Sequence, residues 1–127
     1  HLGIVDGDIV DESNLQRQII HGTSTVGVSK CQSAKQRILD INPLVAVRTY
    51  EKEFTSATAL EILQGGFEEG RPYDVVVDGS DNFPTKYLIS DACEIVGVPW
   101  VYSAILAFEG QLSTFNFPPG VGPNYRD

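Results

Sequence analysis

A chain of 127 residues is the size of one domain, so one hydrophobic core, or part of a larger fold, is expected. Apolar residues make up 42% of the chain and charged residues 20%, which excludes a chain that is disordered throughout. Seventeen acidic against nine basic residues leave a net charge of −8, and no basic stripe is present, which argues against nucleic acid as a partner.

The two cysteines, Cys31 and Cys93, are too few for a disulfide framework and lack the C-x-x-C spacing of a metal or redox pair. They favour a reducing, cytoplasmic location. No apolar stretch approaches the roughly 18 to 20 residues that span a bilayer, so no membrane association is expected. The chain opens on His-Leu-Gly-Ile-Val-Asp, without a methionine or a leader, which is typical of the middle of a strand. We therefore expect a domain truncated at both ends.

Short apolar runs alternate with longer helical stretches, a pattern that predicts an α/β fold with a mostly parallel sheet flanked by helices. Strands are expected at residues 2–5, 45–50, 73–78, 100–104 and 111–117, the last with a more exposed face. Helices are expected in a short stretch through Leu15, Arg17 and Ile19, and at residues 28–41, 57–63 and 83–96. A loop is expected from Pro118 onward. No repeat or linker interrupts this series, so we expect a single α/β domain.

Two of these elements carry specific packing predictions. The three consecutive valines at residues 75–77 predict a central strand that is buried on both faces by flanking helices. In the helix at residues 28–41, Ala34 and Ile41 belong to the predicted apolar face, which leaves Lys30 available to solvent.

Clustered polar residues follow two of the predicted strands, Asp6-Gly7-Asp8 after the first and Asp78-Gly79-Ser80-Asp81-Asn82 after the valine strand. In open α/β sheets, ligands bind beyond the carboxyl ends of the strands. Asp6 is placed to accept hydrogen bonds from a ribose, and a turn cap is an equally good interpretation. No G-x-G-x-x-G occurs in the chain, so a nucleotide fold would have its first strand and glycine-rich loop upstream of His1.

Phosphate chemistry is possible at several polar side chains. Asp81 could present a carboxylate to a magnesium ion that bridges nucleotide phosphates, and Lys30 and Arg17 could neutralise those phosphates. Taken singly, Lys30 is more often a solvated helix residue, and Asp81 with Asn82 is more often a helix cap. His21 follows a predicted helix end, which favours a turn or capping role over catalysis.

The string from Asp6 to Gln18, DGDIVDESNLQRQ, resembles the D-x-D-x-V-x-x-S-N-L-x-R-Q motif of ubiquitin-activating-enzyme-like adenylyltransferases. Further motifs of that family follow in the same order: Val26-Gly27-x-x-Lys30, Ile41-Asn42-Pro43, Asp78-Gly79-Ser80-Asp81-Asn82 and Glu109-Gly110-Gln111. The chain looks most similar to the MoeB/ThiF branch, and the resemblance spans nearly all of residues 1–127. It implies part of a Rossmann-like adenylation domain, whose first strand and glycine-rich loop lie upstream and whose C-terminal part lies downstream.

The resemblance implies that ATP and magnesium activate the C-terminal glycine carboxylate of a small protein as an acyl-adenylate, with release of pyrophosphate. Asp6 would bind the ribose, Arg17, Lys30 and Asp81 would be catalytic, and Asp81 would hold the magnesium. The residues implied to bind ATP are Asp6, Ser13, Asn14, Leu15, Gln16, Arg17, Gln18, Lys30, Asp81 and Asn82. The segment of residues 13–17 would run past the phosphates, with Asn14 and Arg17 as side-chain contacts and Gln18 as support.

The implied partner is a ubiquitin-fold sulfur carrier ending in Gly-Gly, of the molybdopterin-synthase, thiamine or tRNA-thiolation type, and the implied assembly is a homodimer. Where many relatives carry a zinc-binding C-x-x-C, this chain has Asn124 and Asp127, so no structural zinc is expected from this segment. Three alternatives remain open: a non-catalytic module that binds ubiquitin-fold proteins, a tRNA threonylcarbamoyladenosine dehydratase of the same family, and a dinucleotide-dependent oxidoreductase.

Overall fold

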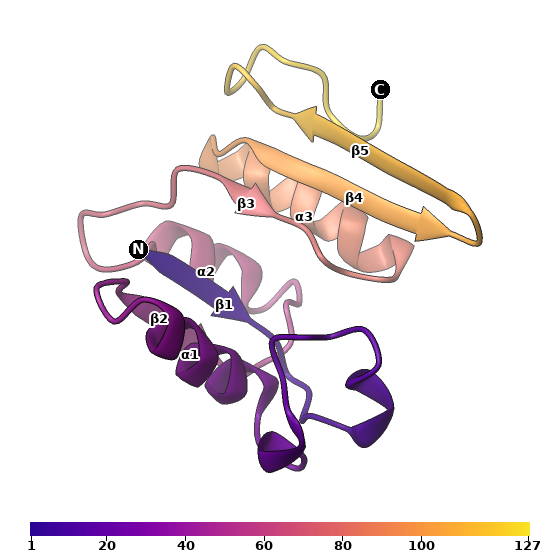
Figure 1. Cartoon of the computed structure of the whole chain (residues 1–127). Helices are drawn as coiled ribbons and strands as arrows, with labels where there is room; N and C mark the ends of the chain where they lie inside the picture. The colour runs from indigo at the N-terminus through magenta and orange to yellow at the C-terminus, as the bar shows by residue number, and fades with distance from the viewer. The chain divides into compact units, whose positions relative to one another are not determined.

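The computed structural model describes residues 1–127, and the chain divides into two compact units, His1–Phe54 and Thr55–Asp127 (Figure 1). Each unit contains a β-α-β element whose two strands are parallel. The predicted α/β class with mostly parallel strands is therefore confirmed. No helix in the chain is both long enough and apolar enough to cross a bilayer.

The first unit is a parallel strand pair with one helix against it. Its elements are β1 (Leu2–Val5), the 3-10 turns η1 (Glu12–Asn14) and η2 (Thr23–Thr25), α1 (Lys30–Ile41) and β2 (Val47–Tyr50). Leu2 lies opposite Val47 and Val5 opposite Tyr50 in the register of β1 and β2. The fully buried Cys31 of α1 places its Sγ 3.4–3.6 Å from the carbonyl oxygens of Ile4, Asp6 and Tyr50, so the thiol joins the helix to both strands.

Helix α1 begins two residues later than predicted, because the Ser29 hydroxyl accepts a hydrogen bond from the Gln32 amide and caps the helix there. Ala34 is buried as predicted, whereas Ile41, in the last turn, is 70% exposed. The prediction that Lys30 is solvated is wrong, since only 14% of its side chain is exposed. The predicted helix through Leu15 and Ile19 is also wrong, because the chain makes only the single turn η1 there, followed by non-helical turns.

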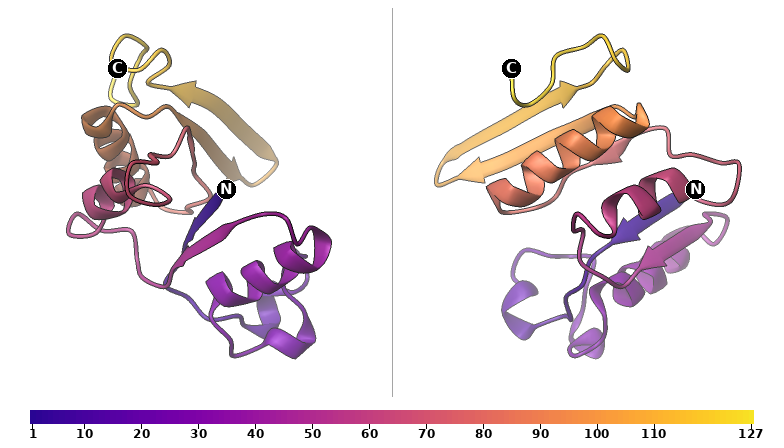
Figure 2. Two further views of the ribbon diagram at one scale, coloured as in Figure 1. Left: turned by 90° about the vertical axis from the view of Figure 1, so that its left-hand side faces the viewer. Right: turned by 180° about the vertical axis from the view of Figure 1, so that it is seen from behind.

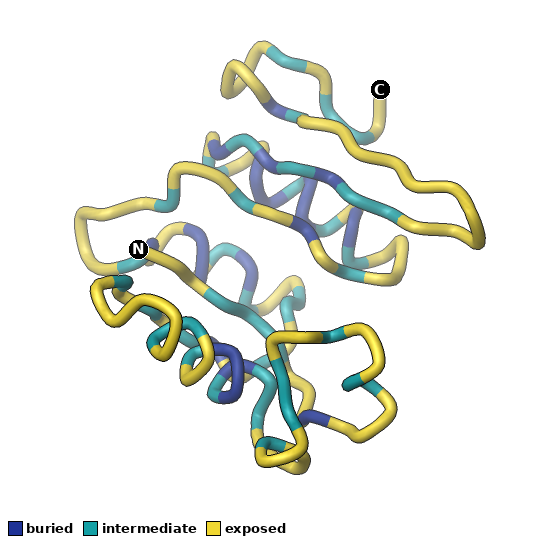
Figure 3. The backbone as a smooth tube through the Cα atoms, viewed as in Figure 1, coloured by how far each residue is buried: buried dark blue, intermediate teal, exposed yellow.

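The second unit is a three-stranded sheet with a helix across one face (Figure 2). Its elements are α2 (Ala59–Gly65), β3 (Val76–Val77), α3 (Phe83–Val96), β4 (Trp100–Leu106) and β5 (Glu109–Phe115), and α2 contacts α3. Strand β4 is parallel to β3, with Trp100 opposite Val76, and antiparallel to β5, with Trp100 opposite Phe115. Buried residues of α3 and β4 form its core, among them Ile89, Ala92, Cys93, Trp100 and Tyr102 (Figure 3).

The valine strand differs from its prediction. Strand β3 is only two residues long and is the edge strand in the order β3-β4-β5. Val75 is 47% exposed and Val77 is 73% exposed. Because α3 covers a single face of this sheet, the alternate residues Val75 and Val77 have no helix against them, and the prediction of burial on both faces is wrong within this unit.

Strand β5 ends two residues earlier than predicted because Asn116 leaves the extended conformation, with φ at 53°. Its buried side-chain nitrogen, Nδ2, donates to the carbonyl oxygens of Cys93 and Val98, each at 3.0 Å, and so holds the end of α3. The loop from Pro118 onward contains no helix or strand, as predicted. It is nevertheless packed, since the Tyr125 ring lies 5.1 Å from that of Tyr102, measured between centroids.

Candidate functional site

The loop that follows β1 contains Asp6, which was predicted to contact a ribose. Its Oδ1 accepts a hydrogen bond from the Asp8 amide at 2.8 Å, so Asp6 caps the turn, and Oδ2 keeps no bond within the chain. Packing explains the glycine at position 7, because a Cβ there would lie 3.0 Å from Glu53 Cγ and 3.1 Å from the Glu53 amide nitrogen. One oxygen of Asp6 therefore shapes the turn while the other stays available to a ligand.

The segment of residues 11–18 is built as a capped turn. Asp11 accepts hydrogen bonds from the Ser13 amide at 2.9 Å and the Ser13 hydroxyl at 2.6 Å, and these bonds lower the pKa of the Asp11 carboxyl. The Asn14 Oδ1 in turn accepts from the Asp11 amide at 3.0 Å, completing a capping box. The side-chain oxygens of Ser13 and Asn14 thus have local structural partners, and their predicted contacts with a nucleotide stay predictions.

The remaining residues of this segment are Leu15, Gln16, Arg17 and Gln18. Gln16 is exposed and Leu15 is half-buried. Arg17 is exposed, donates only to the Ser13 carbonyl at 3.3 Å and has no carboxylate partner, so its guanidinium is available to an anion. The Gln18 Oε1 is buried and has no hydrogen-bond partner.

Lys30 connects the start of α1 to the loop after β1. Its amide donates to the Asp8 carbonyl at 3.0 Å, and its Nζ lies 3.5 Å from Asp8 Oδ2. The pKa of His21 is lowered first by burial and then by the charge of Lys30, while the Asp6 charge acts in the opposite direction. Asp8 also links the two predicted site residues, because its amide donates to Asp6 and its carboxylate lies beside Lys30, so the structure brings Asp6 and Lys30 together within the first unit.

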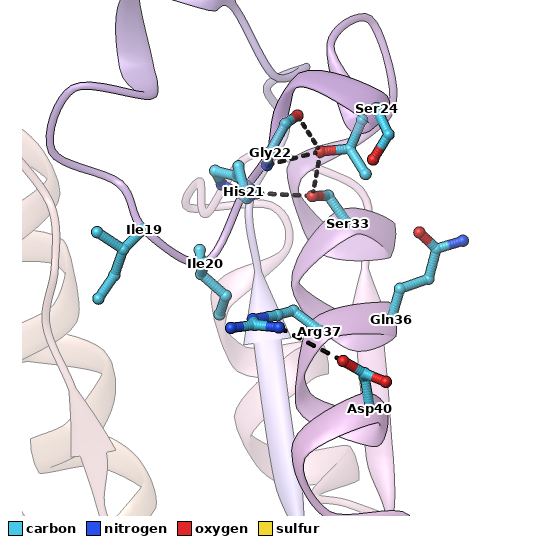
Figure 4. Close-up of a pocket in the computed structure, with 10 residues that line it drawn as sticks. Ile19, Ile20, His21, Gly22, Ser24, Ser33, Gln36, Arg37 and Asp40 are labelled. Carbon is cyan, nitrogen blue, oxygen red and sulfur yellow. Dashed lines mark hydrogen bonds and ion pairs between the residues drawn. The ribbon is translucent and has the colours of Figure 1, made fainter.

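His21 takes part in a relay of hydrogen bonds beside a shallow pocket of about 390 Å³ between residues 19–25 and α1 (Figure 4). Its Nδ1 lies 2.8 Å from the Ser33 hydroxyl, which donates to Thr25 Oγ1, and the Thr25 hydroxyl donates to the Gly22 carbonyl. This order of donors places a proton on Nδ1 of His21. Because Ser33 is only 1% exposed and gives its own proton to Thr25, the pair is not an activated nucleophile, and the predicted turn role of His21 fits.

Asp81 and Asn82 lie in the second unit, at the start of α3. The Asn82 Oδ1 accepts a hydrogen bond from the Thr85 amide at 2.9 Å and caps the helix, whose first turn contains Pro84. Asp81 is exposed, and its nearest bonded partner is the Asn82 amide nitrogen at 3.5 Å. The capping interpretation of Asn82 is correct, and its contact with a nucleotide stays a prediction.

The donor set at Asp81 fits a magnesium ion held jointly with a substrate. Magnesium is usually bound by one or two carboxylates together with phosphate oxygens and waters, rather than by a closed protein cage. Asp81 offers one exposed carboxylate without a cation partner, and no group of three or more His, Cys, Asp or Glu residues gathers anywhere in the chain. The buried Ser80 Oγ beside it lacks a hydrogen bond, which leaves a polar atom for a ligand or water to satisfy.

Asn124 and Asp127, the two tail residues from which no structural zinc is expected, bond to each other. The Asn124 amide donates to Asp127 Oδ2 at 2.9 Å, and the Asp127 amide donates to Asn124 Oδ1 at 3.1 Å. Arg126, between them, makes two bonds of 2.8 Å to the carboxylate of Asp91 in α3. The tail is therefore anchored by hydrogen bonds and an ion pair, and the expectation of no zinc from this segment stays a prediction.

A buried ion pair that the sequence motifs do not predict joins Asp78, directly after β3, to Lys86 of α3. Lys86 Nζ lies 2.9 Å from Asp78 Oδ2, and the side chains are 5% and 0% exposed. The only sequence signal is the spacing, which places Lys86 one turn into the helix that begins after the loop carrying Asp81. A lysine at that position is ordinarily a surface residue, so the spacing alone does not indicate burial.

The profile of the ThiF family matches residues 1–127, the whole of the chain. The chain belongs to the ThiF family. The resemblance to the MoeB/ThiF branch, stated from the sequence motifs, is thereby confirmed.

Curated relatives of this ThiF-family chain are similar over almost all of it. It is 48% identical to the probable adenylyltransferase/sulfurtransferase MoeZ of Mycobacterium tuberculosis, over 99% of this chain and 31% of that protein. It is 46% identical to the sulfur carrier protein adenylyltransferase of Thermus thermophilus, over 98% of this chain and 45% of that protein. It is also 46% identical to the probable molybdopterin-synthase adenylyltransferase of Porphyra purpurea, over 99% and 31% respectively. The chain thus spans less than half the length of these relatives.

Solved structures share the fold of the ThiF-family chain. The crystal structure of E. coli MccB with ATP aligns with a TM-score of 0.80 at 19% identity, over 97% of this chain and 35% of that chain. The crystal structure of PaaA aligns with a TM-score of 0.75 at 22% identity, over 96% and 38% respectively. The Rossmann-like α/β fold predicted from the sequence is confirmed by this likeness.

Proposed function

We propose that the protein containing this chain is an adenylyltransferase that activates the C-terminal glycine of a ubiquitin-fold sulfur-carrier protein, as a homodimer in the cytoplasm. The observation that carries the proposal is the sequence identity of 46–48% to three relatives that are each named an adenylyltransferase. In the reaction, a carboxylate oxygen of the carrier attacks the α-phosphorus of ATP. A bond forms between that oxygen and phosphorus, the bond to the bridging oxygen breaks, and pyrophosphate leaves with the electron pair.

The first unit would bind the nucleotide through a carboxylate and two cations. Asp6 Oδ2, which has no bond within the chain, would accept hydrogen bonds from the ribose. Arg17, which has no carboxylate partner, and Lys30, which has only Asp8 at 3.5 Å, would contact the phosphates. A carrier carboxylate and ATP repel each other, so these cations reduce the repulsion and stabilise the charge that develops on the leaving group.

The second unit would contribute Asp81, whose exposed carboxylate would hold magnesium, with Asn82 beside the nucleotide. When bound, the ion would neutralise phosphate charge and assist the departure of pyrophosphate. The capping hydrogen bond of Asn82 fixes the start of α3, so the position of Asp81 follows from the helix.

ATP–pyrophosphate exchange on the full-length protein, with and without a Gly-Gly-ended sulfur carrier, tests this proposal. We expect exchange that requires the carrier and is abolished when the last glycine of the carrier is removed, because no carboxylate then reaches the α-phosphate. A folded protein that shows no exchange with any such carrier would contradict the proposal and favour the non-catalytic binding module.

Two arginines of the first unit provide a matched pair of variants for that assay. Arg17→Gln removes the guanidinium without a carboxylate partner, and we expect exchange to fall about 10²–10³-fold. Arg37→Gln removes a guanidinium that is also exposed but pairs with Asp40 on α1, and we expect exchange to be unchanged. Equal rates for the two variants would remove Arg17 from the phosphate site.

A further inference from the structure

A buried ion pair lies at the base of the loop that carries Asp81. Lys86 Nζ donates to Asp78 Oδ2 at 2.9 Å and to the Ser103 carbonyl of β4 at 2.7 Å. It also lies 4.9 Å from the centroid of the Tyr102 ring. The ammonium is therefore satisfied by two oxygens and an aromatic face, away from solvent, and it joins α3 to β3 and β4.

Asp78 is fixed through all of its polar groups. Its amide donates to the Val101 carbonyl at 3.0 Å, and its carbonyl accepts from the Ser103 hydroxyl at 2.6 Å. Its Oδ2 accepts from Lys86, and its Oδ1 accepts from the Ser80 amide at 2.7 Å. The last bond turns the chain directly after the strand. Asp78 can rotate away from the Ser80 amide only if it also gives up Lys86.

The loop between Asp78 and Asn82 is held at its two ends. Asn82 is fixed by its capping bond to the Thr85 amide. Between these ends, a Cβ built on Gly79 would contact nothing within 4 Å and Asp81 is exposed, so Ser80 is the one loop residue that packing restrains. The orientation of Asp81 therefore depends mainly on the hydrogen bonds at Asp78 and Asn82.

The need to pack β3, α3 and β4 together does not by itself explain why this pair is ionic. Replacing a buried ion pair by apolar residues is often neutral or stabilising, so an apolar pair could join β3, α3 and β4 equally well. An apolar residue at position 78 would give the Ser80 amide no acceptor. The carboxylate is thus needed by the loop, and the lysine is needed to orient that carboxylate in its buried position.

We propose that Lys86 is a positioning residue, which acts through Asp78 to hold the loop of residues 79–82 so that Asp81 can bind magnesium. This inference rests on the proposed function for the role of the ion. The ordering of the loop by Lys86 can be measured without any activity.

The test uses four forms of the full-length protein: the unmodified protein, Lys86→Met, Lys86→Arg and the control Lys35→Met, which removes a lysine of α1. The first measurement is amide hydrogen exchange of peptides covering residues 79–82. The second is the magnesium concentration that gives half-maximal carrier-dependent ATP–pyrophosphate exchange. A variant that is merely less folded would lower the maximal rate without moving this concentration.

For Lys86→Met we expect faster hydrogen exchange at residues 79–82 and a half-maximal magnesium concentration about tenfold or more higher. Lys86→Arg keeps the charge and several donors, and should stay within a few-fold of the unmodified protein, as should Lys35→Met. Unchanged hydrogen exchange in the loop together with an unchanged magnesium dependence in Lys86→Met would overturn the inference.

Two further outcomes are separable. If Lys86→Met does not fold, Ser103→Ala, which removes only the hydroxyl bond to the Asp78 carbonyl, should give a smaller shift in the same direction, and no shift would overturn the inference. If the unmodified protein shows no exchange of pyrophosphate with any carrier, the proposed function fails. The hydrogen exchange of the loop in Lys86→Met would still decide whether Lys86 orders it.

Discussion

Replacing Lys86 by methionine should destabilise the second unit by an amount that depends on Asp78. The Asp78 side chain is 0% exposed, and after the change its Oδ2 would have no donor. Removing one partner of a buried ion pair costs about 3–5 kcal/mol because the other charge is left uncompensated. In the double variant Asp78→Asn, Lys86→Met no buried charge remains, and the main loss is the donor to the Ser103 carbonyl, about 1–3 kcal/mol.

The double variant should therefore be more stable than the Lys86→Met single variant. Hydrogen exchange of β4 peptides in increasing urea measures this locally, since β4 contains Ser103 and the buried Trp100. The free energies of unfolding of the two single variants and the double variant then give the coupling between the residues. A double variant that is less stable than Lys86→Met would refute the reasoning that the unpaired carboxylate causes the loss.

The other predictions concern the metal ligand, the thiols and the tail. Asp81→Ala should abolish magnesium-dependent pyrophosphate exchange and leave the circular dichroism spectrum unchanged, because Asp81 is exposed; near-normal activity would exclude it as a ligand. Burial, with a smaller effect of the Asp78 charge, raises the pKa of Cys93 to about 12, and burial also raises that of Cys31. Iodoacetamide at pH 8 should therefore leave both thiols unmodified in the native protein and alkylate both in urea, as read by mass spectrometry; native modification of Cys93 would contradict this. Hydrogen bonds from Arg126 lower the pKa of Asp91, so their stabilisation is present above the unfolded value of about 3.8 and is lost as the pH falls through the lower folded value. The difference in hydrogen-exchange protection of the tail between the unmodified protein and Arg126→Gln should vanish over that range, and a difference that persists in acid would argue against the ion pair.

Local sequence patterns predicted the elements that are long enough to show a clear hydrophobic periodicity. The helix of residues 83–96 was predicted at the bounds that α3 has, because Asn82 is a good cap and Gly97 adopts the left-handed conformation that ends a helix. The predicted start of α1 was two residues too early, because Ser29 and not an earlier residue caps the helix. Such errors are small because capping residues and periodicity are both properties of neighbouring residues.

Long-range contacts account for what the sequence could not predict. The composition of the valine run indicates a buried strand, but only the tertiary arrangement shows that α3 covers one face of its sheet. Asn116 continues an alternating pattern, yet it bonds to carbonyls of Cys93 and Val98, more than 15 residues away in the chain. Lys86 is buried for a similar reason, because its partner Asp78 follows β3 and its partner Ser103 lies in β4.

The candidate site was predictable as a set of motifs but not as a geometry. The motif identified the family correctly, and the structure then shows that Ser13 and Asn14 also build a capping box with Asp11. A single residue in such a motif can have a structural role and a proposed functional role at once, as the two oxygens of Asp6 illustrate. Side-chain spacing alone could not separate these roles, because it does not show which polar atoms are already bonded.

In the proposed reaction, a carrier carboxylate attacks the α-phosphorus of ATP. The most direct measurement incubates the full-length protein and a Gly-Gly-ended carrier with ATP labelled either at the α-phosphate or at the γ-phosphate. We expect the α-label to become attached to the carrier, while the γ-label leaves within pyrophosphate. Attachment of the γ-label, or of neither label with a folded protein, would contradict it.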